Sequence, residues 1–131
     1  ETTFFAETGL PAAWLKQTRE LLRLKRQLIL QGVPGTGKTH VARCLARLLT
    51  GGDAEAVRVL QFHPGYSYEE FIEGIKVRSV PNADGGEARI SYPVEEGILL
   101  RFAERAAANP SQPHVLILDE INRGNLPRIF G

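Results

Sequence analysis

The stretch Gly32–Thr39, GVPGTGKT, decides the fold that this sequence predicts. It matches G-x-x-x-x-G-K-[ST], the pattern of a phosphate-binding loop between a strand and a helix. The glycines let the backbone approach a polyphosphate closely, and the loop N–H groups and the helix N-terminus attract the same anion. The pattern therefore predicts a nucleoside triphosphate site in an α/β protein.

The positions of this loop have different expected roles. Lys38 would bridge the β- and γ-phosphates and act as a catalytic residue, and the Thr39 hydroxyl would ligate Mg²⁺. A chance glycine-rich turn is the alternative, but the match has an apolar run before it and a strong helical pattern after it. The residues expected to contact the nucleotide are Gly32, Val33, Pro34, Gly35, Thr36, Gly37, Lys38, Thr39 and His40.

The segments on either side of the loop have the patterns that this context requires. Gln27–Gln31 is a short apolar run, which predicts a fully buried strand of a parallel sheet. Lys38–Leu49 has apolar residues at helical spacing and ends just before two glycines, which predicts a helix. We expect a further amphipathic helix over Leu10–Lys25, and we expect the single cysteine, Cys44, to be a buried apolar residue.

Shorter elements are expected downstream. Val57–Phe62 is rich in β-branched and aromatic residues, which predicts a second strand. Ser67 opens an S-x-x-E capping box, which predicts a short helix that ends at Gly74. Two alternating runs in Ile75–Tyr92 flank a turn rich in Gly, Pro and Asn, which predicts a β-hairpin. Val94–Ala108 has an apolar stripe at helical spacing and predicts a helix.

A second chemical motif follows the last predicted strand. Val115–Leu118 is a continuous apolar run that stops at Asp119 and Glu120, the pattern of a Walker B motif at 115–120. Asp119 would hold Mg²⁺ through water, and Glu120 would polarise or deprotonate the attacking water. Taken alone, such a run more often marks a strand that ends at the surface. Together with the loop at 32–39, it predicts a Mg²⁺-dependent triphosphate site.

Composition and charge limit the other possibilities. The 131 residues make about one domain, and they are 43% hydrophobic and 24% charged, as in an ordinary globular protein. The formal net charge of +1 gives no overall field that would attract nucleic acid or an anionic membrane. The sequence has no apolar run of membrane-spanning length and no basic secretory leader at its start. We therefore expect a cytoplasmic protein without membrane contacts.

Three blocks of the sequence resemble one family more specifically than the loop alone does. They are GVPGTGKT (Gly32–Thr39), QFHPGYSYEEFIEGIK (Gln61–Lys76) and VLILDEINRGNLPRIFG (Val115–Gly131). Over about Leu21–Gly131 the chain resembles the McrB-type AAA+ family, the NTP-driven motor subunits of 5-methylcytosine-specific restriction systems. The resemblance implies an AAA+ P-loop NTPase core, a three-layer α/β sandwich with a mainly parallel sheet, here with a β-hairpin insertion.

The resemblance also implies an activity and an assembly. Such proteins form a ring, usually a hexamer, that binds ATP or GTP with Mg²⁺ at each subunit boundary. Hydrolysis in the ring would drive DNA translocation and activate a separate nuclease subunit. By position, Lys38 and Thr39 carry over as phosphate and Mg²⁺ ligands, Asp119 as the Mg²⁺ carboxylate and Glu120 as the hydrolytic base.

Four other residues match the family pattern with more than one expected role. Asn122 and Arg123 belong to D-E-I-N-R, where they would contact the nucleotide or a neighbouring subunit, or would cap the next helix. His63 would sense phosphate or be a structural residue. Arg128 would be presented to a neighbouring subunit or be an ordinary surface residue.

The sequence also departs from the family pattern. In AAA+ proteins the sensor-1 strand, the arginine finger and the helical lid follow Walker B, and residues 1–131 include none of them. We therefore expect a single domain, the N-terminal portion of an AAA+ core, with low stability and little hydrolysis on its own. Two other functions stay open. One is an ATP-driven remodeller or chaperone of the MoxR or dynein-related type, and the other is an assembly module that binds nucleotide without hydrolysing it.

Overall fold

Helices dominate the first half of the chain, whereas the second half contains five of the six strands, four of them in succession between α4 and α5. The computed structural model describes all residues 1–131. The helices are α1 (Thr2–Thr8), α2 (Ala12–Lys25), α3 (Lys38–Leu49), α4 (Tyr68–Phe71), α5 (Ile98–Ala108) and α6 (Leu126–Phe130). The strands are β1 (Val57–Gln61), β2 (Glu73–Ile75), β3 (Arg78–Val80), β4 (Arg89–Ser91), β5 (Val94–Glu96) and β6 (Val115–Asp119). Two short 3₁₀ turns, η1 (Ala54–Ala56) and η2 (Ile121–Arg123), complete the set.

The chain divides into two units, each with its own core. The first unit comprises Glu1–Arg58 and Pro113–Ile117, and the second comprises Val59–Gln112 and Leu118–Gly131. Each unit therefore contains part of strands β1 and β6.

No helix combines the length and the apolar character that a membrane span requires.

The first unit is built on helices α1, α2 and α3. Its buried core residues are Phe4, Leu15, Cys44 and Leu45. The predicted helix over Leu10–Lys25 is confirmed as α2, which begins at Ala12 and leaves Leu21 46% exposed. Helix α1 is an addition that we did not predict from the sequence, and it contributes Phe4 to the core.

Helix α3 has the predicted bounds and carries the predicted buried cysteine. Cys44 is 4% exposed. Burial is the larger cause that raises the pKa of its thiol, and the hydrogen bond to the Glu7 carboxylate is the next. The helix ends as expected, because Gly51 and Gly52 adopt left-handed backbone angles. The Gly52 amide then donates to the carbonyl oxygen of Arg47 at 2.8 Å.

The predicted strand at Gln27–Gln31 is wrong. These residues lie outside helices and strands, and Ile29 is 88% exposed. A buried strand needs neighbours that satisfy its backbone N–H and C=O groups, and no strand within residues 1–131 pairs with this segment. An apolar run is therefore not sufficient to form a strand here.

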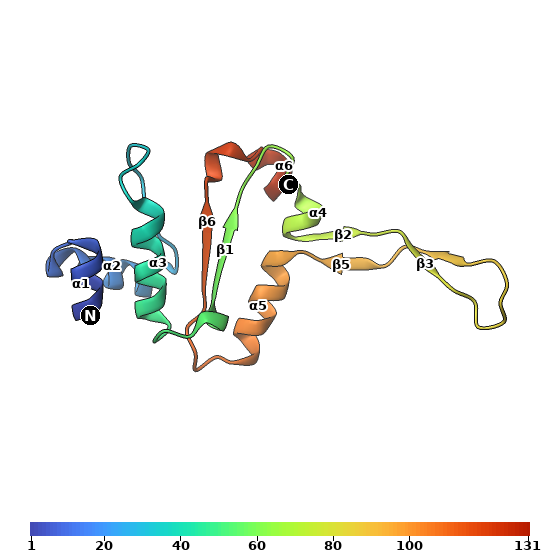
Figure 1. The fold of residues 1–131 in the computed structure, drawn as a ribbon, viewed down its shortest axis with the longest axis horizontal. Coiled ribbons are helices and arrows are strands. Elements are labelled where there is room, and N and C mark those ends of the chain that lie inside the picture. The colour runs from blue at the N-terminus through green and yellow to red at the C-terminus, as the bar shows by residue number, and fades with distance from the viewer. The chain divides into compact units, whose positions relative to one another are not determined.

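Strands β1 and β6 form a two-stranded sheet and run in the same direction (Figure 1). They confirm the predicted strands at Val57–Phe62 and Val115–Leu118, with the ends shifted by one residue. At the end of this sheet the Phe62 amide donates to the carbonyl oxygen of Asp119 at 2.9 Å. The chain thus has the α/β character and the parallel pairing that the sequence predicts.

The second unit has an aromatic core. Its buried residues are Phe62, Tyr66, Phe71 and Ile129, and the rings of Phe62 and Phe71 meet edge to face at 5.5 Å between centroids. The short helix predicted after Ser67 is confirmed as α4, but it ends before Gly74 because β2 begins at Glu73. Ser67 occupies the N-cap position, yet its side chain makes no capping hydrogen bond, so the predicted capping box does not form.

The predicted hairpin exists and is longer than expected. Strand β2 pairs with β5 and β3 pairs with β4, both antiparallel, and the resulting ribbon extends away from α4 and α5 (Figure 1). Val94, predicted to begin a helix, instead pairs with Ile75 in the sheet, so α5 begins only at Ile98. The longer ribbon satisfies backbone groups that a helix start at Val94 would leave unpaired.

Gly97 joins the ribbon to α5 where the backbone approaches α4 closely. A Cβ atom at this position would lie 2.5 Å from the carbonyl oxygen of Phe71 and 2.6 Å from the amide nitrogen of Ile72. Backbone atoms cannot move aside as side-chain ends do, so Gly97→Ala is expected to lower the free energy of unfolding of the full-length protein by about 1–3 kcal/mol. Urea denaturation measures this loss.

Gly86→Ala is the matched control for this prediction. A Cβ atom there would meet only the Asn82 side-chain nitrogen, at the ordinary contact distance of 3.6 Å. This variant is expected to be as stable as the parent protein. Equal stability of the Gly97 and Gly86 variants would contradict the close approach described above.

Candidate nucleotide-binding site

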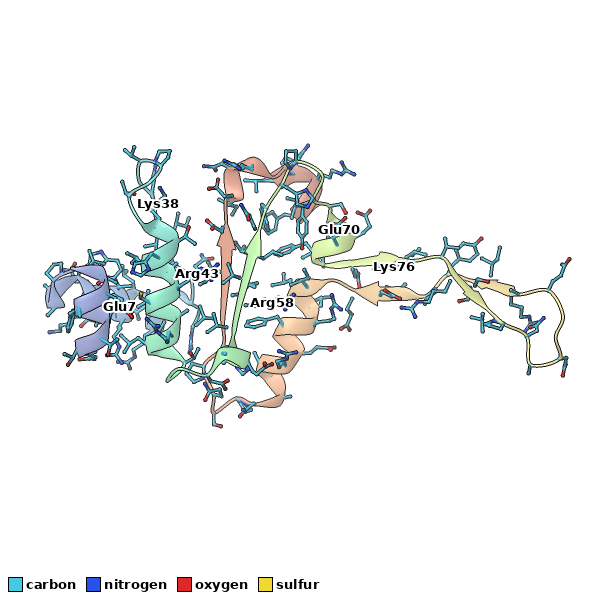
Figure 2. All side chains as sticks on the ribbon, in the orientation of Figure 1. Glu7, Lys38, Arg43, Arg58, Glu70 and Lys76 are labelled. Atoms are coloured by element: carbon cyan, nitrogen blue, oxygen red, sulfur yellow. The ribbon has the colours of Figure 1, made fainter.

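The phosphate-binding loop forms a turn that is stabilised by its own side chains. Gly35 and Gly37 have φ angles of 79° and 81°, a region that glycine enters without steric cost. The Thr36 hydroxyl donates to the carbonyl oxygen of Val33 at 2.7 Å. The Lys38 ammonium donates to the carbonyl oxygens of Gly32 and Val33 at 2.8 Å each. The amine therefore lies on the loop itself, at the start of α3 (Figure 2).

Helix α3 begins immediately after this loop. Gly37 is its N-cap residue, and the helix runs for 12 residues from Lys38. The first-turn N–H groups of a helix have no intrahelical acceptor and carry partial positive charge, so this end of α3 favours an anion. Thr39 lies in the same first turn, directly after Lys38. The loop and the first turn together provide the elements that polyphosphate recognition requires.

His40, which we predict among the nucleotide contacts, has a different neighbour in the structure. Its Nε2 atom lies 3.1 Å from the carbonyl oxygen of Glu7, in α1. His40 still belongs to the first turn of α3, so it remains near the loop in sequence. Its contact with nucleotide stays a prediction.

The predicted Walker B carboxylates follow each other at the end of β6. Asp119 is the last residue of the strand, and its Oδ1 atom accepts a hydrogen bond from the Glu120 amide at 2.9 Å. Glu120 has left-handed backbone angles, φ 54° and ψ 40°, and N-caps the 3₁₀ turn η2. Its carboxylate oxygen Oε2 lies 3.1 Å from Nε of Arg123.

The left-handed conformation of Glu120 is unusual for a residue with a Cβ atom. It costs about 1–2 kcal/mol relative to the right-handed region. Strain of this kind is concentrated at functional sites, where the surrounding structure maintains it. Arg26 at the C-cap of α2 shares this conformation, so the catalytic role of Glu120 stays a prediction from the D-E motif.

The structure distinguishes between some of the alternative roles around this motif. Asn125 caps α6, because its side-chain oxygen accepts from the Arg128 amide at 3.2 Å. The alternative that Asn122 or Arg123 caps this helix is therefore wrong. Asn122 and Arg128 are exposed, and Arg123 pairs with Glu120.

His63 is exposed and contacts the buried Tyr66. The two rings meet edge to face with centroids 5.4 Å apart. This packing against a core residue agrees with the structural alternative for His63, whose phosphate-sensing role stays a prediction.

Each half of the predicted site is assembled within its own unit. The loop and the first turn of α3 belong to the first unit, and Asp119 and Glu120 belong to the second. A common site for both halves is a prediction from the motifs. The donor atoms are suited to Mg²⁺, because a hydroxyl such as that of Thr39 and a carboxylate such as that of Asp119 are hard oxygen ligands.

Sequence reasoning missed two features of these halves. The Glu120–Arg123 ion pair was detectable, since residues three apart on a helical turn face each other. The contact between Glu7 and His40 was not, because α1 has no clear helical pattern and the two residues are far apart in sequence.

A phosphate-binding loop that opens a helix, together with carboxylates at the end of a parallel strand, is typical of a P-loop NTPase fold. Residues 27–131 match the AAA domain family (dynein-related subfamily). The chain therefore belongs to the AAA domain family and has its P-loop NTPase fold.

Two curated proteins are similar to the chain. The Type IV methyl-directed restriction enzyme EcoKMcrB subunit of Escherichia coli (strain K12) is 42% identical over 123 residues, which cover 93% of this chain and 25% of that protein. The Type II restriction enzyme BsuMI component YdiS of Bacillus subtilis (strain 168) is 27% identical over 127 residues, which cover 85% of this chain and 37% of that protein. These findings confirm the resemblance to McrB-type AAA+ proteins. The chain spans about a quarter of the first relative and just over a third of the second.

Proposed function

We propose that this chain binds and hydrolyses a nucleoside triphosphate, ATP or GTP, with Mg²⁺, as part of an AAA+ motor module. The observation that carries the proposal is the Lys38 ammonium, held on two carbonyl oxygens of the loop that opens α3. A terminal phosphate is a stronger partner for an ammonium group than a carbonyl oxygen, because a charged acceptor shortens and strengthens the hydrogen bond. Residues Gly32–His40 form the proposed nucleotide contacts.

The proposed chemistry assigns one step to each side chain. Lys38 neutralises charge that develops on the γ-phosphate oxygens, and the loop N–H groups orient the phosphates. Thr39 and Asp119 would hold Mg²⁺, which supplies further neutralisation of phosphate charge. Glu120 accepts a proton from the attacking water, and Arg123, its ion-pair partner, orients that carboxylate before the reaction.

The biological setting that we propose is a restriction system. Both relatives carry names of restriction enzyme components, and the chain belongs to an AAA family. By this likeness, the full-length protein forms a ring, usually a hexamer, whose hydrolysis drives DNA translocation and activates a nuclease subunit. We propose a cytoplasmic location, because restriction acts on DNA in the cell.

Two alternative functions use the same residues. A remodeller or chaperone is favoured by the family description, which names the dynein-related subfamily. An assembly module that binds nucleotide without hydrolysis is favoured if Glu120 stays paired with Arg123 when nucleotide is bound.

Titration of the full-length protein with ATP and GTP separately, with and without methylated DNA, tests the proposal. We expect Mg²⁺-dependent binding of one of the two triphosphates and faster hydrolysis when DNA is present. Stimulation by a protein client alone would support the remodeller, and tight binding without turnover would support the assembly module. Absence of binding to both triphosphates would contradict all three functions.

A further inference from the structure

Helix α1 packs against α3 through the core cluster that Phe4 shares with Cys44 and Leu45, and Glu7 adds polar contacts between the two helices. The backbone carbonyl of Glu7 meets the His40 ring at 3.1 Å, and its carboxylate accepts from the Cys44 thiol at 3.3 Å. The same carboxylate oxygen forms an ion pair with Arg47. The spacing of His40, Cys44 and Arg47 places them on one face of α3, so Glu7 contacts successive turns of that helix.

The three α3 residues also contact each other. The Cys44 sulfur lies 3.6 Å from Nε2 of His40 and 3.7 Å from Nη2 of Arg47. Cys44 is buried and Glu7 lies where α1 meets α3 (Figure 2). His40, Cys44 and Arg47 therefore form a row of polar contacts along α3 from its first turn to its last turn. Glu7 connects this row to α1.

Helix α1 is also anchored by apolar packing. Phe4 is 3% exposed and stacks on Trp14 with ring centroids 6.3 Å apart. The helix ends at Gly9, whose φ of 66° permits the chain to turn into α2. Carbonyl groups in the last turn of a helix lack intrahelical partners. The Glu7 carbonyl has the His40 ring nitrogen as its hydrogen-bond partner instead.

His40 directly follows Lys38 and Thr39 in the first turn of α3. Any displacement of that turn relative to α1 would shift the helix N-terminus and the two proposed ligands together. Residues 1–26, which contain α1, precede the part of the chain that matches the AAA family, residues 27–131. The contact therefore links a segment before the family match to the proposed nucleotide site.

We propose that Glu7 is a positioning residue for nucleotide binding, through which α1 holds the first turn of α3 in its binding geometry. This inference rests on the proposed function. A helix that is already in place avoids the ordering cost that binding would otherwise include, so the contact raises nucleotide affinity. By linkage, bound nucleotide must also stabilise α1 against local opening.

The test compares nucleotide affinity and turnover of full-length variants. Glu7→Gln keeps the carbonyl and the side-chain size but removes the charge that pairs with Arg47. We expect the dissociation constant for the triphosphate to rise about fivefold, with kcat unchanged. Glu20→Gln, an exposed carboxylate on α2, is the matched control and is expected to bind nucleotide as the parent protein does.

A double-mutant cycle separates positioning from general stability. Glu7→Gln with Arg47→Gln is expected to bind nucleotide no more weakly than either single variant, because each change breaks the same pair. The charge exchange Glu7→Lys with Arg47→Glu is expected to restore affinity. Hydrogen exchange of the α1 amides is expected to slow on nucleotide binding in the parent protein and not in Glu7→Gln.

Different outcomes would contradict the role of Glu7 and the proposed nucleotide-binding function. Unchanged affinity in a folded Glu7→Gln variant, with α1 exchange insensitive to nucleotide, overturns the inference alone. If Glu7→Gln does not fold, Arg47→Lys, which keeps the charge and loses the planar fork, decides by the same two readouts. A parent protein that binds no triphosphate overturns both the inference and the proposed function.

Discussion

Lys38→Ala in the full-length protein is expected to weaken nucleoside triphosphate binding by about 10- to 150-fold. The ammonium group, which lies on the carbonyl oxygens of Gly32 and Val33, is the charged donor of the loop. Hydrogen bonds to charged groups contribute about 1.5–3 kcal/mol, and the γ-phosphate loses this partner in the variant. Fluorescence titration with a labelled triphosphate measures the change in dissociation constant.

Two controls show whether a loss of affinity in Lys38→Ala is specific to the loop. Lys16→Ala removes an exposed lysine from α2 and is expected to leave affinity unchanged. Circular dichroism of both variants checks that the fold is retained. A folded Lys38→Ala variant that binds triphosphate as tightly as Lys16→Ala would show that the loop is not the phosphate site.

Glu120→Gln is expected to retain nucleotide binding and to lower kcat by about 10²–10⁴-fold, the usual contribution of a general base. The amide keeps the size of the side chain and cannot accept the proton of the attacking water. The variant should therefore accumulate in its triphosphate-bound form. Single-turnover hydrolysis with a radiolabelled γ-phosphate measures the rate of the chemical step separately from binding.

The control for Glu120 is a carboxylate of the same chemistry at an unrelated place. Glu20→Gln on α2 is expected to hydrolyse nucleotide at the parent rate. Undiminished single-turnover hydrolysis by Glu120→Gln would remove this residue from the mechanism. Loss of binding rather than of turnover would assign it to nucleotide recognition instead.

Much of the fold was predictable where local patterns are strong. Lys38–Leu49 has helical periodicity, a loop motif before it and glycines after it, and its bounds are as predicted. The strand ending at Asp119 was equally clear, because a continuous apolar run stops at two carboxylates. Such signals depend only on neighbours in sequence.

Other elements depend on partners that a single segment does not show. Gln27–Gln31 has the composition of a strand but no neighbour to pair with, whereas Val94 leaves a helical pattern because Ile75 pairs with it. In both cases the presence or absence of a pairing partner outweighed the local pattern.

In the candidate site, too, local motifs were predictable and contacts between distant segments were not. The motifs predict Lys38, Thr39, Asp119 and Glu120 as site residues by residue type and spacing, since phosphate and Mg²⁺ chemistry requires those groups. The partners of these segments were not predictable, because the contact of Glu7 with α3 joins residues more than 30 positions apart. The motifs therefore predict the chemistry, and the structure adds the contacts of Glu7 with α3.

The central claim is that one Mg²⁺-bound triphosphate is held by the loop at Gly32–Thr39 and by the carboxylates at Asp119 and Glu120. A crystal structure of the full-length protein with a non-hydrolysable triphosphate and Mn²⁺ tests it most directly, because anomalous scattering locates the ion. We predict an ion bonded to the Thr39 hydroxyl and linked to Asp119 through water, with the γ-phosphate at Lys38. A triphosphate bound away from the loop, or an ion without Thr39 and Asp119 around it, would contradict the claim.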